Sequence, residues 1–323
     1  MAGVGVSLEE IIRMSAHALV VGVGGGGDVV GALATARFLE FCGLRFTLGG
    51  LSWERSVYDP KPGPRRLSEI QKLRLLHPAV GMANAETQTC DGVRFAESNM
   101  AALTGREVLL VDINGGVEQV TDGLDKALKA LDADFLVGID VGGDSLAQGG
   151  EAGLRSPLAD SIMLAAWQAL EARGRRVLWG VFGYGSDGEL TTDEIEAALS
   201  IVARAGGLLG AWALTPKVVD EMEEVVRKVQ TEASAIPVEC ARGAWGEKKI
   251  RQDQRRVRLT PLTTLTFYLS PSILFEALSR PARAVASSGS LEEANNALHA
   301  IGLKTELDLE RERYQREQGL SKD

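Results

Sequence analysis

Two carboxylates that enclose a pair of glycines are the residues in this sequence best suited to chemistry. Asp140 and Asp144 flank Val-Gly-Gly and follow the apolar run 134–139. Two such side chains after a strand can converge on one hard cation, which prefers oxygen ligands, and carboxylates directed into a cleft are costly unless paired or metal-bound. We therefore expect Asp140 and Asp144 to bind Mg²⁺. The small residues of the same loop are expected to line the ligand: Gly142, Gly143 and Ser145.

Two acidic residues downstream extend this motif. Glu151 follows a Gly-Gly pair, and Asp160 ends the segment Ser-Pro-Leu-Ala-Asp. Glu151 is a candidate general base that would activate water or a hydroxyl group. The alternative is structural: Asp144 and Asp160 would cap turns and helices, and Glu151 would lie on the surface.

A run of four glycines is the second candidate site. Gly24, Gly25, Gly26 and Gly27 precede Asp28, between an apolar run and a helical pattern. Glycines let the backbone approach a ligand, and amides at a helix N-terminus favour an anion. We expect the glycines to bind a phosphate group and Asp28 to be a second candidate base. The alternative is a tight turn in which Asp28 caps the helix.

The glycine loop also resembles the motif that binds a dinucleotide. Counted from Gly22 it satisfies G-x-G-x-x-G, which any glycine-rich run matches by chance. The predicted second strand, 45–51, leads into Ser52 without the acidic residue that would hold a ribose hydroxyl group. A nicotinamide-dependent oxidoreductase is therefore a weak alternative.

Two further glycine-bearing loops each follow an apolar run, after residues 111 and 182. Alone, each could be an ordinary turn. Because ligands of open parallel sheets bind outside the carboxyl ends of the strands, we expect all four loops to surround one crevice. The residues of these two loops that we expect at the ligand are Asp112, Asn114, Gly183, Gly185 and Asp187.

A basic segment and three scattered histidines carry less information. Arg242, Lys248, Lys249 and Arg251 could close over a phosphate group, but a solvated basic face on a loop or hairpin is the favoured interpretation. The histidines do not suggest a catalytic triad. No G-x-S-x-G elbow, P-loop lysine signature or kinase motif set occurs.

Alternating strand and helix patterns predict an α/β fold with a doubly wound, mostly parallel, Rossmann-like sheet and helices on both faces. Strands are assigned to short apolar runs and helices to apolar residues three or four apart. The predicted strands are 17–23, 45–51, 107–111, 134–139, 176–182, 210–214 and 236–240. The predicted helices are a short first helix after Ser7, then 29–41, 121–131, 160–173, 192–205 and 216–232.

Length and composition indicate one globular unit. We expect a single α/β domain over 1–323, with an excursion at 58–89 that could cover the cleft and a polar C-terminal tail from residue 306. Apolar residues make up 45% of the chain, enough for a large core. The net charge of −9 argues against nucleic acid or an anionic membrane as partner. A homo-oligomer is compatible with these features.

The N-terminus and the cysteines indicate the cellular compartment in which the protein is expected. The three cysteines are far apart and form no C-x-x-C motif, which fits a reducing cytoplasm better than a disulfide framework. The N-terminus lacks a signal-peptide pattern, and no apolar stretch approaches the length that a membrane helix needs. We therefore expect a cytoplasmic protein.

The motifs together resemble the domain of unknown function 1152 family of archaeal and bacterial proteins. The resemblance covers most of the chain, and it implies no activity because the family is named for lacking one. Val141 stands where the family has a bulkier polar residue, a departure that leaves the acids in place. The matching segments are 25–28, 49–52, 140–146, 150–151, 156–160, 183–187, 207–210 and 261–264.

These residues predict a Mg²⁺-dependent hydrolase or transferase that acts on a small phosphorylated or nucleotide-like compound. The alternative from another class is a non-catalytic nucleotide-binding or regulatory protein whose glycine loops hold the ligand without turnover. An intact nucleotide that co-purifies without metal would favour the binding protein. A dinucleotide lying across the glycine loop would favour the oxidoreductase.

Overall fold

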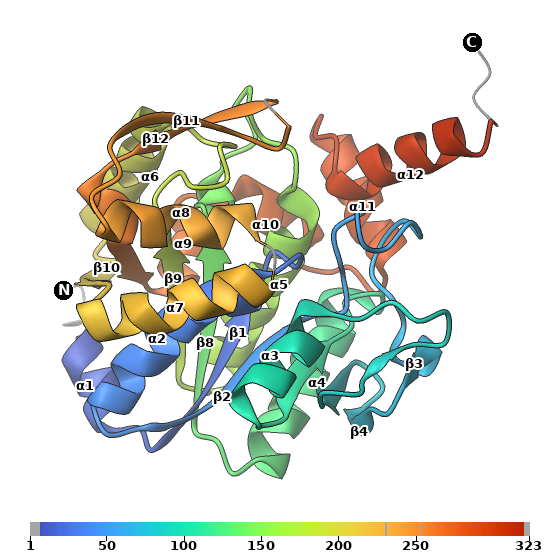
Figure 1. Cartoon of the computed structure of the whole chain (residues 1–323), viewed down its shortest axis with the longest axis horizontal. Coiled ribbons are helices and arrows are strands. Elements are labelled where there is room, and N and C mark those ends of the chain that lie inside the picture. Colours follow the sequence, from blue (N-terminus) through green and yellow to red (C-terminus); the bar gives the residue numbers. More distant parts are fainter. Residues whose placement is uncertain (1–6, 230, 253, 320–323) are drawn as a thin grey trace.

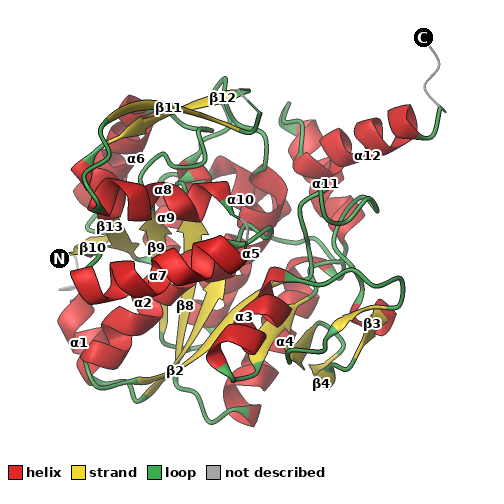
Figure 2. Ribbon diagram, viewed as in Figure 1, coloured by secondary structure: helices red, strands yellow, loops and turns green. Residues whose placement is uncertain are grey.

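The computed structural model describes residues 7–229, 231–252 and 254–319. Its centre is a nine-stranded sheet in the order β10-β13-β9-β8-β1-β2-β7-β5-β4 (Figure 1, Figure 2). The five parallel strands in the middle are β9 (Val177–Phe182), β8 (Phe135–Val141), β1 (His17–Gly22), β2 (Arg45–Leu51) and β7 (Val108–Val111). Antiparallel pairings add β10 (Leu208–Ala213), β13 (Leu265–Leu269), β5 (Val80–Ala83) and β4 (Arg74–His77). The predicted doubly wound, mostly parallel sheet is confirmed.

The order of the parallel strands reverses beside β1. The chain runs outwards from β1 to β2 and β7, then returns to the other side of β1 to form β8 and β9. Ligands of open α/β sheets bind at such a reversal, outside the carboxyl ends of the strands. The loops that follow β1 and β8 therefore lie where a ligand is expected.

Helices cover both faces of the sheet. One face carries α1 (Leu8–Arg13), α2 (Asp28–Phe41), α3 (Ala96–Thr104), α7 (Pro216–Lys228) and α8 (Glu232–Ala241). The other carries α4 (Gly116–Ala130), α5 (Pro157–Ala172), α6 (Thr192–Arg204), α9 (Pro271–Ala277), α10 (Arg280–Val285) and α11 (Leu291–Ala300). Because the central strands are covered on both sides, their sequences are continuous apolar runs instead of alternating ones. Among the described residues, no helix is long and apolar enough to cross a membrane.

One predicted strand is wrong. Residues 236–240 belong to α8, not to a strand. Their apolar character is explained by packing: Val238 joins the core beneath α7, and Ile236 and Cys240 contact the following hairpin. That hairpin, β11 (Gly246–Ile250) and β12 (Arg255–Leu259), occupies the basic segment, as predicted.

The predicted excursion is an ordered extension of the sheet. Its chain forms η1 (Leu67–Glu69), the ribbon β3 (Ile70–Gln71) with β6 (Gln88–Thr89), and the edge strands β4 and β5. In Figure 1, β3 and β4 lie at the edge of the molecule, and β4 packs against α4. This part of the excursion extends the sheet at its β7 edge.

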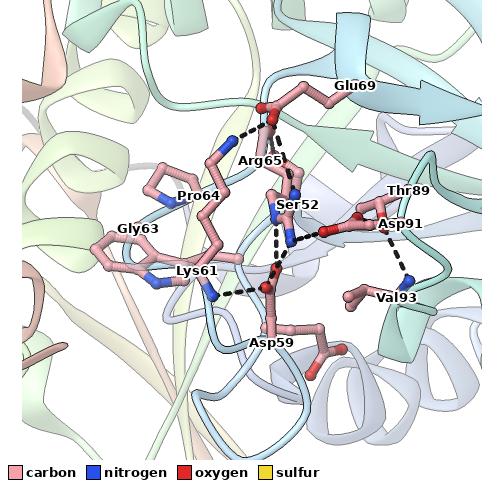
Figure 3. Close-up of polar contacts among 12 residues, drawn as sticks. Ser52, Asp59, Lys61, Gly63, Pro64, Arg65, Glu69, Thr89, Asp91 and Val93 are labelled. Carbon is pink, nitrogen blue, oxygen red and sulfur yellow. Dashed lines mark hydrogen bonds and ion pairs between the residues drawn. The ribbon is translucent and has the colours of Figure 1, made fainter. Parts of the chain in front are cut away.

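A buried arginine organises the start of the excursion (Figure 3). Arg65 is 3% exposed and donates two hydrogen bonds to the carboxylate of Asp59, at 2.6 and 2.7 Å, and one to Asp91 at 2.8 Å. Its backbone N–H donates to the Ser52 carbonyl at 2.7 Å, and the Ser52 hydroxyl donates to its carbonyl at 2.6 Å. Arg65 thereby fastens the excursion to the end of β2.

The predicted polar tail forms α12 (Glu306–Glu317), which begins with a capping box at Thr305. Its first residue is not exposed to solvent. The Glu306 carboxylate accepts the N–H groups of Leu158 and Ala159 at 3.0 and 2.8 Å, at the start of α5. The C-terminal helix therefore contacts the end of α5 that faces the crevice.

Candidate functional site

Three of the four predicted loops meet at the ends of β1, β8 and β9. Asp28 joins the first two, because its Oδ2 accepts the N–H of Gly24 at 3.0 Å and that of Val141 at 3.4 Å. The loop after β9 joins through Gly185, whose N–H donates to the Gly142 carbonyl at 2.7 Å. These bonds bring the carboxylates of the three loops to one place.

Buried carboxylates form the floor of this crevice, which we call the acid crevice. Candidate ligand atoms of Asp140, Asp144 and Asp160 all lie within 4.8 Å of one another, and so do those of Asp144, Asp187 and Glu189. None of the five residues is more than 9% exposed. The acid crevice therefore concentrates negative charge away from water.

Asp140 is held in a fixed orientation. Its Oδ1 accepts the N–H of Gly143 at 3.2 Å, and its Oδ2 accepts the N–H of Ser145 at 3.1 Å and the Ser145 hydroxyl. The Ser145 oxygen in turn accepts the indole N–H of Trp179 at 3.0 Å. Trp179 packs edge-on against Trp167 in the core, with ring centroids 5.8 Å apart. The core thus positions this carboxylate.

Two carboxylates of the acid crevice have no hydrogen-bond partner in the part of the chain that the structure describes. Both oxygens of Asp160 and both oxygens of Asp187 are buried and unpaired. Asp160 lies in the first turn of α5, where the helix dipole favours negative charge. Buried polar groups normally have partners, and an unpaired buried carboxylate is costly. A bound cation would supply the missing partner.

Burial and like charges raise the pKa values of these groups. Burial raises the pKa of Asp144 and of Asp160 well above the usual value, and the charges of neighbouring carboxylates add to it. Burial, followed by the charge of Glu189, raises the pKa of Asp187 to about 8. The pKa of Asp28 is also raised, by burial and then by Asp140. Without a cation, burial and like charge favour the protonated form of these carboxyls.

A small cavity lies beside the unpaired Asp160. It offers about 10 Å³ to the centre of a water molecule and is lined by Asp144, Ser145 and Ser161 as well. That space is about the size that one water molecule or ion needs.

Gly142 is required by the geometry of the acid crevice. Its φ of +122° lies in the left-handed region. A Cβ atom there would lie 2.3 Å from the carboxyl carbon of Asp187. Glycine at this position lets the end of β8 approach Asp187.

The glycine loop is folded onto the segment after β2. Gly25, Gly26 and Gly27 all have positive φ, and the Gly26 N–H donates to the Trp53 carbonyl at 2.9 Å. The Gly26 amide is thus occupied by the protein itself. Within the described residues, the N–H groups of Gly25 and Gly27 have no backbone or side-chain acceptor, so they are the amides left for an anion.

Three arginines lie near the glycine loop and the acid crevice. A Cβ atom on Gly26 would lie 2.7 Å from the side chain of Arg55. Arg255 donates to Glu189 at 2.9 Å and to the Asp187 carbonyl at 3.1 Å. Burial, then the charges of Arg55 and Arg255, lower the pKa of Arg251. Guanidinium groups close enough to repel one another are a suitable setting for an anionic ligand.

The predicted solvated basic face fits part of the basic segment only. Arg242 pairs with Asp220 and Glu223 in exposed ion pairs, and Lys248 pairs with Glu239. Arg251 differs because it lies between β11 and β12 with its Nε 3.8 Å from Glu232 but without a hydrogen bond to the described residues, and because the charge of Asp187 acts on it.

Asp112 and Asn114 hold the excursion. The Asp112 carboxylate accepts the N–H of Leu67 at 3.2 Å and both N–H groups of Asn114, at 2.8 and 2.7 Å. The Asn114 side chain also donates to the Pro64 carbonyl at 3.0 Å. These contacts stabilise the excursion. Within the described residues, no hydrogen bond or ion pair joins either side chain to the carboxylates of the acid crevice.

The Glu151 carboxylate is hydrogen-bonded to the backbone of its own loop. Its carboxylate accepts the N–H groups of Gln148, Gly149 and Gly150 at 2.8 to 2.9 Å. The glutamate that lies beside Asp144 is Glu189, whose carboxylate also accepts the N–H groups of Arg155 and Ser156. Glu151 remains a predicted base without a contact to the acid crevice.

Several site residues were not among those assigned from the sequence. Glu189 stands two residues after Asp187, and Asp160 lies in a motif that the sequence analysis described, so the neighbouring sequence could have indicated both. Nothing in the sequence around Arg55 or Arg255 indicates a site, because only tertiary contacts bring them to the glycine loop and the acid crevice.

The fold and the site define a class: a Rossmann-like α/β protein with an acid-lined crevice at the reversal of its sheet. The chain belongs to the family described as protein of unknown function (DUF1152), whose model matches residues 19–314. The match spans the glycine loop, the acid crevice and most of α12. Searches of curated proteins and of solved structures found no match.

Proposed function

We propose that this protein is a Mg²⁺-dependent hydrolase or transferase that acts on a small phosphorylated or nucleotide-like compound. The observation that carries the proposal is the pair of buried, unpartnered carboxylates, Asp160 and Asp187, beside Asp140 and Asp144. Hard cations take carboxylate oxygens as ligands. Bound Mg²⁺ would supply charge that neutralises phosphoryl oxygens.

The anionic part of the substrate would lie against a wall of hydrogen-bond donors next to the carboxylates. The free amides of Gly25 and Gly27 and the guanidinium groups of Arg251 and Arg255 offer hydrogen-bond donors and positive charge there. Guanidinium groups match the geometry of phosphate oxygens. A ligand with phosphoryl groups would contact both this wall and the bound cation.

Asp28 is the base that the geometry favours. Its carboxylate lies between the glycine loop and β8, and burial and the charge of Asp140 raise its pKa, the direction that favours proton uptake by a base. Glu151 is less suited, because three backbone N–H groups occupy its carboxylate.

The two alternatives differ in their support. For a nicotinamide cofactor, the first acidic residue after β2 in the sequence is Glu54. It is buried and accepts the N–H of Ala96 at the start of α3, so its carboxylate is already engaged within the protein. A non-catalytic binding protein would use the same arginines and glycines without turnover. We also propose a cytoplasmic location, which the three unpaired cysteines support.

Mg²⁺ should bind to the wild type and at least about tenfold more weakly to Asp140→Asn, since the amide keeps the shape but loses the charge. Isothermal titration with Mg²⁺ and Mn²⁺ measures this. Asp193→Asn, an exposed aspartate of α6, is the matched control and should bind like the wild type. Equal binding by Asp140→Asn, or no binding by the wild type, would remove the cation from the proposal.

Turnover separates the enzyme from the binding protein. The enzyme should release inorganic phosphate from p-nitrophenyl phosphate or ATP in a Mg²⁺-dependent manner, and Asp28→Asn should lower the rate. Retention of intact ATP without phosphate release would favour the binding protein.

Arg251→Gln should weaken the binding of pyrophosphate in the presence of Mg²⁺ by about tenfold or more, because it removes one partly desolvated positive charge from the wall. Arg242→Gln is the control, since Arg242 pairs with surface carboxylates and should not affect affinity. Titration calorimetry gives both affinities. If the two variants bind alike, Arg251 is not part of an anion site.

A further inference from the structure

The acid crevice contains two sets of cation ligands with one residue in common. Asp140, Asp144 and Asp160 form the first set, and Asp144, Asp187 and Glu189 form the second. We infer that the acid crevice binds two divalent cations, one in each set, with the Asp144 carboxylate shared between them. The inference rests on the cation site of the proposed function and adds a second position to it.

The first set has an unsatisfied ligand and a small cavity that two of its members line. Asp160 is 2% exposed, and neither of its oxygens accepts a hydrogen bond from the described residues. The small cavity lies directly beside Asp160 and Asp144. Asp140, fixed by Ser145, completes this set from the end of β8.

The second set has its own unsatisfied ligand. Asp187 is 5% exposed, and both of its oxygens lack a hydrogen-bond partner among the described residues. Glu189 is held in place by the N–H groups of Arg155 and Ser156, at 2.7 and 2.9 Å. The Ser156 hydroxyl also donates to Asp144 at 3.1 Å, so Ser156 links the two carboxylates of this set.

One cation does not satisfy both sets. The unpaired carboxylates belong to different sets, and neither set contains both Asp160 and Asp187, so a cation bound by Asp140 and Asp160 would leave Asp187 buried without a partner. Arg255 does not take that place, because it contacts Glu189 and the backbone carbonyl of Asp187 instead of the Asp187 carboxylate. A second cation would satisfy Asp187.

The shared ligand fits the known spacing of paired cations. In two-metal sites the ions are about 3.5–4 Å apart, a distance that the two oxygens of one carboxylate can bridge. Such pairs act on phosphate esters and anhydrides, where they stabilise the attacking and the leaving oxygen of an in-line displacement. Within the proposed function, the second position narrows the substrate to a compound with a displaceable phosphoryl group.

The test is the number of Mn²⁺ ions that the full chain binds, measured by isothermal titration and by electron paramagnetic resonance. The wild type should bind two ions and show the spin coupling of a close Mn²⁺ pair. Asp160→Asn and Asp187→Asn should each bind one ion without coupling, and Asp144→Asn should lose both. Neither the Asp160 nor the Asp187 carboxylate accepts a hydrogen bond from the described residues, so both variants should fold, which circular dichroism checks.

The outcomes separate this inference from the proposed function. One ion in the wild type overturns the second position and leaves the single-cation enzyme standing. No ion in the wild type overturns both. Two uncoupled ions, or loss of both ions in either Asp160→Asn or Asp187→Asn, would show that the two donor sets do not form the bridged pair.

Discussion

Removal of divalent cations should make this protein less stable at about pH 8 than at about pH 5.5, and Mg²⁺ should largely abolish the difference. Burial and Glu189 raise the pKa of Asp187 to about 8 in the cation-free fold, whereas an unfolded aspartate titrates near 4. Burial raises the pKa of Glu306, which contacts the same end of α5, to about 8 as well.

The sign follows from proton binding. Between about pH 4 and pH 8 the folded protein keeps protons on these carboxyls that the unfolded chain has lost, so the free energy of unfolding falls as the pH rises. Their contribution is most favourable below about pH 4 and is lost as the pH passes 8. A cation that binds the ionised carboxylates adds more stability at pH 8, where fewer protons compete with it.

Thermal unfolding in EDTA and in Mg²⁺ at the two pH values measures the effect. We expect the melting temperature in EDTA to be lower at pH 8 by about 5 °C or more, since several groups contribute in the same direction. Asp187→Asn in EDTA should be more stable than the wild type at pH 8 and similar to it at pH 5.5, whereas exposed Asp193→Asn should follow the wild type. Equal melting temperatures at both pH values in EDTA would contradict the assignment of these carboxyls.

The framework of the site could be predicted because it depends on local sequence. Short apolar runs that end in glycine and a carboxylate mark strands whose ends face the same edge. Asp28 and Asp187 follow two of these strands, and Asp140 is the penultimate residue of a third. The reversal beside β1 brings these three ends together. Asp112 follows the same local rule, but β7 lies two strands from β1, and its loop holds the excursion.

The remaining ligands depend on contacts between distant segments. Glu151 and Glu189 both follow glycine-rich segments, and nothing local distinguishes the carboxylate that closes its own loop from the one that reaches Asp144. Glu306 meets Ala159 across 147 positions of the chain. Arg255 reaches Glu189 only through the β11–β12 hairpin. Sequence patterns carry no information on such pairings.

The second large effect is a loss of stability on substitution of Arg65, the buried arginine of the excursion, which lies outside the acid crevice. Arg65→Ala should lower the free energy of unfolding by about 3–5 kcal/mol, because it leaves the carboxylate of Asp59 buried without its partner. The Arg65 and Asp59 side chains are 4% and 2% exposed, so water cannot replace the lost hydrogen bonds. Urea unfolding at neutral pH measures the loss.

Two comparisons show whether that loss comes from the buried charge. Arg74→Ala removes a cation whose ion pair with Glu107 is exposed, and it should cost at most about 1 kcal/mol. The double variant Arg65→Met, Asp59→Asn removes both charges and should recover much of the stability. A single Arg65→Ala variant no less stable than Arg74→Ala would mean that Asp59 is not held in a buried pair.

Arg65→Ala should also lower the affinity for the anionic ligand, because Arg65 supports the backbone that contacts the glycine loop. The Arg65 side chain is anchored on Asp59 and Asp91 and so fixes the Arg65 backbone, whose N–H and carbonyl bond to Ser52. The next residue, Trp53, accepts the Gly26 N–H at 2.9 Å, so loss of the side chain should loosen the support of the glycine loop. In the folded fraction of Arg65→Ala, affinity for pyrophosphate with Mg²⁺ should therefore fall, while Mn²⁺ binding to the acid crevice should change little. If both affinities match those of the wild type, the excursion stabilises the sheet edge without positioning the glycine loop.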